Sequence, residues 1–111
     1  MEVHDCCSIT ELVTMAVLHI FKQGQGRRDV LDGGFDADEA LPCHIDGGLK
    51  CFGQPIGASG LHMTSEKRLQ LLARAAERQR ENRSSFGLSH NLGGMPNQNV
   101  SAVVIAGLIG A

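Results

Sequence analysis

Apolar residues recur with helical spacing near the start of the chain. The stripe consists of Ile9, Leu12, Val13, Ala16, Val17 and Ile20, about 3.6 residues per turn. Ser8 and Glu11 stand at the spacing of a capping box, in which each side chain bonds the backbone N–H of the other residue. The pattern predicts a helix over residues 8–22, ended by Gly24 and Gly26. Further apolar residues on its other side indicate burial on more than one face.

A second helix is predicted over residues 58–80, with Leu61, Leu69 and Leu72 on its apolar side. Its later half is basic, which is typical of a solvated helix face; these residues are Arg74, Arg78, Arg80 and Arg83. Residues 27–40 form a polar, acidic connector that predicts an exposed loop, with a brief extended piece at residues 30–31.

The strands are predicted at the two ends of the chain. Residues 2–6 resemble the tail of a strand, residues 86–90 a short strand and residues 91–94 a turn. The Val- and Ile-rich run at residues 100–109 suits a strand buried on both faces. The order of elements predicts an α/β fold, a mixed sheet with helices packed on it.

Length and charge bound the class of protein. The 111 residues are enough for one domain, 42% of them are apolar, and the net charge is −2. This balance does not favour nucleic acid or an anionic membrane as a partner. No secretory signal is visible and the longest apolar segment is too short to cross a bilayer, so a cytoplasmic protein is expected.

The four cysteines are Cys6, Cys7, Cys43 and Cys51. They form no C-x-x-C pair, and their spacing fits no known zinc pattern, so free thiols and no metal site are expected. A metal site built from Cys6, Cys43, Cys51 and histidines is the minor alternative. The glycines match neither a P-loop nor a serine-hydrolase elbow.

Glycine is concentrated between residues 41 and 60, at Gly47, Gly48, Gly53, Gly57 and Gly60. Such density in a chain of ordinary composition predicts close backbone approach or unusual φ values.

Three segments together resemble one family: HDC at residues 4–6, GGLKCFGQPIGASG at 47–60 and HNLGG at 90–94. They are similar to the C-terminal half of thiolases, in the branch of the sterol-carrier-protein-type enzymes. The resemblance covers nearly the whole chain, as one domain over residues 1–111, and the glycine-rich segment is its most specific part. The nucleophile-bearing half is not among these residues, and is expected on a missing segment or a separate chain.

The resemblance implies roles for particular residues. Cys6 would be the acid/base thiol, and His4 would help to form the first oxyanion site. Backbone N–H groups near Gly93 and Gly94 would contribute to the second oxyanion site. His90 and Asn91 would line the pocket, although they could equally cap a turn. Gly57 and Ser59 would bind substrate, a coenzyme A thioester, and no other cofactor is implied.

The chain departs from the family pattern at Gln54, which stands where the family has the histidine of Gly-His-Pro. A glutamine can donate a hydrogen bond but cannot accept the thiol proton. Cys7 replaces a usual Phe. Four further residues are unusually polar for a buried helix, which predicts a more exposed helix here; they are Thr64, Ser65, Lys67 and Arg68.

Two functions are therefore compatible with the sequence. One is an acyltransferase domain acting on acyl-CoA thioesters together with a nucleophile-bearing half. The other is a non-catalytic remnant or interaction module with the same fold, which Gln54 favours. The apolar surfaces near residues 9–20 and Val103 predict either self-association or packing against the N-terminal thiolase half.

Overall fold

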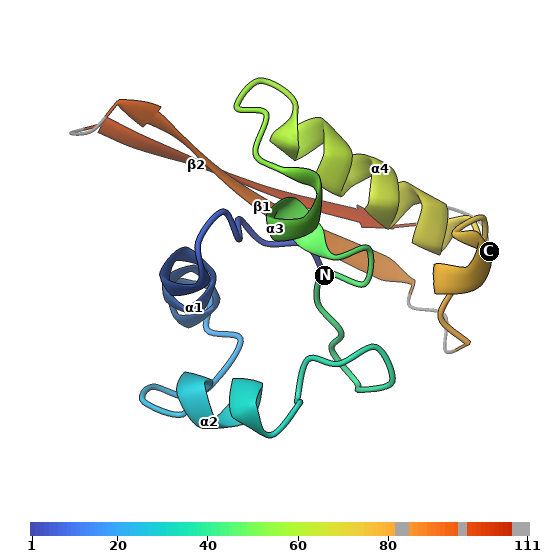
Figure 1. Ribbon diagram of the computed structural model, residues 1–111, viewed down its shortest axis with the longest axis horizontal. Helices are drawn as coiled ribbons and strands as arrows, with labels where there is room; N and C mark the ends of the chain where they lie inside the picture. The colour runs from blue at the N-terminus through green and yellow to red at the C-terminus, as the bar shows by residue number, and fades with distance from the viewer. Residues whose placement is uncertain (82–84, 96–97, 108–111) are drawn as a thin grey trace.

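The computed structural model describes residues 1–81, 85–95 and 98–107 (Figure 1). The helices and strands are α1 (Ser8–Val17), α2 (Gly26–Leu31), α3 (Gly48–Phe52), α4 (Ser59–Leu71), the 3₁₀ turn η1 (Ala76–Arg78), β1 (Phe86–Met95) and β2 (Gln98–Gly107).

The two strands form a long antiparallel ribbon, with Phe86 opposite Gly107 at one end and Met95 opposite Gln98 at the other. The N-terminal segment adds a parallel bridge to the other edge of β1. There the Glu2 N–H donates to the Leu88 carbonyl, and the His90 N–H donates to the Glu2 carbonyl, both at 2.9 Å. Helix α4 lies along this ribbon (Figure 1). The predicted α/β class is confirmed.

Helix α1 begins as predicted but ends at Val17, so the prediction of a helix to residue 22 was wrong. His19 adopts a left-handed φ of 55°, and the Ile20 N–H donates to the Met15 carbonyl at 3.0 Å. This is a Schellman ending, which usually has glycine at the left-handed position. The predicted capping box is also absent, because Cys7 is the N-cap and no side chain caps the helix.

Helix α4 ends in the same way at Leu71, well before residue 80. Ala73 has a φ of 56°, and the Arg74 N–H donates to the Leu69 carbonyl at 2.9 Å. The chain then turns through η1 to reach β1. Both helices were predicted too long because a histidine and an alanine occupy positions where glycine normally marks the end.

The prediction of a turn at residues 91–94 was wrong, because β1 continues to Met95. The prediction that residues 100–109 are buried on both faces was also wrong: Val103 is 48% and Ile105 67% exposed. Positions 108 and 109 of that run lie outside the described residues, as does Arg83. A two-stranded ribbon covered by one helix leaves the other face of β2 open.

Two short helices lie where loops were expected. Helix α2 occupies part of the acidic connector, including the piece predicted to be extended. The ring of Phe21 packs directly over Gly26, where any Cβ would collide with it. Helix α3 occupies the glycine-rich segment and begins from Gly47, whose φ is 100°.

The interior contains more polar than apolar residues. The buried apolar side chains are Val3, Met15, Leu49, Met63 and Ala75. The buried polar and charged residues are Glu2, His4, Asp5, Thr14, Asp46, Ser59, Glu66, Lys67, Ser89 and His90. The fold therefore depends on polar groups that are paired with each other. No helix among the described residues is long and apolar enough to cross a membrane.

The polar stretch of α4 is only partly exposed, in contrast to the prediction. Thr64, Ser65 and Arg68 face solvent, but Lys67 is buried against the sheet. Its Nζ donates to Ser89 Oγ at 3.0 Å and to the Val104 carbonyl at 3.2 Å. Burial lowers the pKa of the Lys67 ammonium. The cost of burying this group is offset by these two bonds.

Candidate functional site

Three segments far apart in the sequence meet at the His4 imidazole. Nδ1 of His4 lies 2.8 Å from Asn91 Oδ1 on β1, and Nε2 lies 3.2 Å from Gln54 Nε2 in the loop before α4. The backbone N–H of Leu92 also points at Nδ1, at 3.4 Å. The imidazole is thus held between two side-chain amides and the backbone of β1.

Ser59 joins the same cluster from the first turn of α4. Its side chain is buried, and its Oγ donates to Asn91 Oδ1 at 3.4 Å. The next residue, Gly60, lets the helix approach Asn91, since a Cβ there would lie 3.0 Å from Asn91 Nδ2. We call His4, Gln54, Ser59 and Asn91 the His4 cluster.

The carboxylate of Asp5 connects the glycine-rich segment to the N-terminal segment that carries His4. Asp5 is fully buried, and its Oδ1 accepts the Leu49 N–H at 2.8 Å. Gly48 has a φ of 64°, and a Cβ there would collide with Asp5 and lie 2.9 Å from His44 Nδ1. The predicted need for glycine is therefore met at Gly48 by both criteria, close approach and positive φ.

The other glycines placed at the site differ in their surroundings. A Cβ at Gly57 or Gly93 would meet no atom within 4 Å among the described residues, and neither has a positive φ. Gly94 has a φ of 103° near the end of β1. On β1, Gly93 lies opposite Val100 and Gly94 opposite Asn99 of β2, so the backbone at both glycines belongs to the ribbon.

Cys6 lies just before the N-cap of α1 and is partly buried. Its Sγ contacts Thr10 Oγ1 at 3.8 Å, within the first turn of that helix. Helix N-termini stabilise a nearby thiolate. Cys6 is thus separated from His4 by one residue, but it makes no hydrogen bond to the His4 cluster within the described part of the chain.

His90 neighbours Asn91 on β1, so the two side chains point to opposite faces of the ribbon. Its Nε2 lies 2.7 Å from Ser101 Oγ on β2. Burial, and secondarily the nearby His4, lower the pKa of the His90 imidazole, which favours its neutral form. The structure therefore separates His90 from the four residues of the His4 cluster.

A second group of polar pairs supports the glycine-rich segment. Asp46 accepts the Gly48 N–H at 2.9 Å and pairs with His62 Nε2 at 2.8 Å. His44 Nδ1 pairs with Glu2 at 3.2 Å. Burial lowers the pKa of His44, but the side chains of Cys43 and Glu2 outweigh burial and raise it to about 10. No spacing rule signals these pairs, since each joins different segments of the chain.

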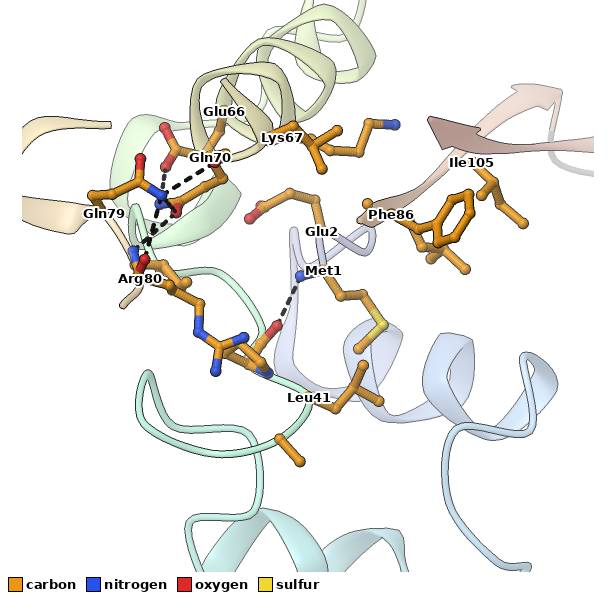
Figure 2. A pocket seen from close by; sticks show the side chains of 16 residues that line it. Met1, Glu2, Leu41, Glu66, Lys67, Gln70, Gln79, Arg80, Phe86 and Ile105 are labelled. Carbon is orange, nitrogen blue, oxygen red and sulfur yellow. Dashed lines mark hydrogen bonds between the residues drawn. The ribbon is translucent and has the colours of Figure 1, made fainter. Parts of the chain in front are cut away.

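A cavity of about 310 Å³ lies away from the His4 cluster, between the end of α4, the start of β1 and the loop before α3 (Figure 2). Its wall includes Glu66, Lys67 and Arg80, and the Met1 amine donates to the Pro42 carbonyl beside it at 2.7 Å. No member of the His4 cluster lines this cavity. It is a separate feature of the molecule.

The three segments that meet around His4 are those that resemble thiolases. The family described as thiolase C-terminal domain-like matches residues 1–106. The chain belongs to this family. The resemblance seen in the sequence is confirmed, and the His4 cluster is its candidate functional site.

Curated relatives support the assignment. The chain is 38% identical over 94 residues to an acetyl-CoA acetyltransferase of Methanothermobacter thermautotrophicus, covering 85% of this chain and 24% of that protein. It is 37% identical over 93 residues to human sterol carrier protein 2, covering 84% of this chain and 17% of that protein. A non-specific lipid-transfer protein-like 2 of Caenorhabditis elegans is 31% identical, covering 84% of this chain and 22% of the relative. The chain thus spans about a quarter or less of the relatives it matches.

Proposed function

We propose that this thiolase-type domain supplies the acid/base and oxyanion side of an acyltransferase site that acts on acyl-CoA thioesters. The nucleophilic cysteine would come from a segment outside these residues. The observation that supports this most is the His4 cluster, because it gathers an imidazole, two amides and a hydroxyl from three family segments.

The cluster offers donors for a thioester oxygen. Asn91 Nδ2 makes no hydrogen bond within the described residues, and Gln54 Nε2 has a second hydrogen besides the one that faces His4. Donors fixed in advance stabilise an oxygen on which negative charge develops. Cys6, beside the N-terminus of α1, would take the proton from the α-carbon of the acyl group, which could then attack a second acyl unit.

Gln54 sets the expected rate. It donates to His4 but cannot take the proton of a nucleophilic thiol, so that step would go through another group or through water. Loss of a general base typically lowers the rate by ~10²–10⁴-fold. We therefore expect a slow acyltransferase.

The second candidate is a non-catalytic module that keeps the fold. Exposed apolar residues along α1 favour it, since they suit packing against another protein: Ile9 is 68%, Val13 54% and Val17 69% exposed. The same surface suits a nucleophile-bearing half or a second copy of this chain, so it does not by itself decide between the two functions.

The deciding experiment combines this chain with the nucleophile-bearing half of the archaeal acetyltransferase and measures thiolysis of acetoacetyl-CoA. We expect slow turnover that Gln54→His increases by ~10²-fold or more. Cys6→Ala should abolish turnover, whereas Cys51→Ala, at an exposed position on α3, should leave it unchanged.

Binding separates failure of chemistry from failure of assembly. Calorimetry with acetyl-CoA on the combined halves should show saturable binding that His4→Ala weakens. If the complex assembles and binds acetyl-CoA, but the parent chain and Cys6→Ala have equal turnover rates, the acid/base role of Cys6 is refuted. A complex that assembles without binding acetyl-CoA would favour the non-catalytic module.

A further inference from the structure

A second group of reactive side chains lies outside the His4 cluster. Glu11 on α1 meets Cys43 and His44 in the loop before α3, and one ligand atom of each lies within 4.8 Å of the other two. His44 Nε2 lies 3.6 Å from Glu11 Oε1. All three side chains are partly buried.

The carboxylate of Glu2 and the backbone of Met1 hold the imidazole of His44 toward Glu11 and Cys43. Its Nδ1 faces the buried Glu2 carboxylate, and its backbone N–H donates to the Met1 carbonyl at 3.1 Å. The side chain is only 10% exposed. Its Nε2 is buried and has no hydrogen-bond partner among the described residues. Nε2 faces the sulfur of Cys43 and lies 3.6 Å from Glu11 Oε1, so a bound cation would replace the proton that these groups hold on the imidazole.

We propose that Glu11, Cys43 and His44 bind a divalent cation of the zinc class. Thiolate, imidazole and carboxylate are the three ligand types that zinc takes in proteins, and three protein ligands leave a fourth position for water. The hydrogen bond between Glu2 and Nδ1 is the arrangement that orients a metal-bound histidine and strengthens it as a ligand.

The geometry requires only a small closure. With bonds of 2.0–2.3 Å, ligand atoms around tetrahedral zinc are about 3.5 Å apart. The separation of Nε2 and Oε1 already matches this value, and the sulfur must approach by about 1.3 Å at most. Lys50 pairs with the other oxygen of Glu11, Oε2, and leaves Oε1 toward His44.

The sequence analysis expected no metal site, because the three proposed ligands follow no zinc-finger spacing. Cys43 and His44 are adjacent, and Glu11 comes from a different element. The minor alternative in the sequence combined Cys43 with Cys6 and Cys51. Cys6 contacts Thr10 instead, and Cys51 is exposed on α3.

The test uses Co²⁺ as the probe, titrated into the reduced full chain in a buffer without chelator. We expect a one-to-one complex with an intense near-ultraviolet absorption from thiolate-to-cobalt charge transfer, reversed by added Zn²⁺. Cys43→Ser should remove this absorption, and Glu11→Gln should weaken binding at least 10-fold. Cys51→Ser is the matched control and should keep both the absorption and the affinity.

Folding is checked by circular dichroism, and zinc-induced stabilisation is measured as a shift in melting temperature. Cys43→Ser should remain folded and lose the shift, while Cys51→Ser keeps it. An imidazolium held between Glu2 and Glu11 with no metal would give neither the absorption nor the shift, and that result would overturn the proposal. Equal binding by the parent chain and Cys43→Ser would overturn it as well.

Discussion

The region around α4 and β1 differs from the outer face of α1 in which kind of residue it buries and which it exposes. Around α4 and β1, charged and polar residues are buried and paired, such as Lys67 with Ser89 and Glu66 with Arg78. On the outer face of α1, apolar residues are exposed and no other described residue covers them. The first region is complete within the described residues, whereas the second has the composition of an interface.

The difference teaches where this small domain obtains its stability. Few apolar side chains are buried among the described residues, so hydrophobic burial there is limited. Buried polar pairs specify how the segments meet, because an unpaired partner would be costly. We therefore expect substitutions in the α4–β1 region and the glycine-rich segment to affect folding, and substitutions on α1 to affect association.

The largest effect is expected from Gly48→Ala. The added Cβ would collide with the buried Asp5 carboxylate, and the residue would keep a φ of 64° that alanine disfavours. Together these costs should lower the free energy of unfolding by about 3 kcal/mol. Urea denaturation followed by circular dichroism measures the change.

Gly57→Ala is the matched control, because its Cβ would enter open space at an ordinary φ. The free energy of unfolding should change by less than about 0.5 kcal/mol. Similar losses in both variants would show that Gly48 is not the point where the glycine-rich segment packs on Asp5.

A smaller effect of opposite sign is expected from Ala73→Gly. Ala73 occupies the left-handed position of the Schellman ending of α4, where glycine has no steric cost. The substitution should raise the free energy of unfolding by about 1 kcal/mol. Ala16→Gly, at an exposed helical position of α1, is the control and should lower the free energy of unfolding by about 0.5–1 kcal/mol. A destabilised Ala73→Gly would contradict the assigned ending.

The pH dependence of stability should reflect His90. Its pKa is lower in the folded state than in the unfolded state, because burial and His4 oppose its protonation. The unfolded state therefore binds the proton more readily, so this contribution to stability is complete above about pH 6.5 and is lost as the pH falls through the lowered pKa. Thermal melts of the parent chain should show this loss, and His90→Gln should reduce it. An unchanged pH dependence in the variant would assign the effect to another group.

The smallest change in stability is expected from Val13→Glu on α1. The side chain is already half exposed, so the free energy of unfolding should change by less than about 0.5 kcal/mol. Association should change far more, because a charge would enter the apolar face. Sedimentation of the parent chain should show self-association that this variant reduces. A parent chain that stays monomeric at high concentration would leave the nucleophile-bearing half as the partner that this face fits.

Sequence reasoning succeeded where the signal was local. The start of α1 after Cys7, the start of α4 near Ala58 and the start of β1 at Phe86 all follow from short-range pattern. It failed at the ends of both helices, because His19 and Ala73 give no stop signal. It also failed at residues 91–94, where two glycines suggested a turn but pairing with β2 continues the strand.

The family, the α/β class and a need for glycine somewhere within residues 41–60 were determined by the sequence alone, because each depends on residue types at short spacings. Only the tertiary structure decided that His4 binds Gln54 and Asn91, that Lys67 is buried, and that Glu11 faces Cys43 and His44. Those contacts join segments that are distant along the chain. Their energies depend on the three-dimensional packing of the whole domain, which no local pattern contains.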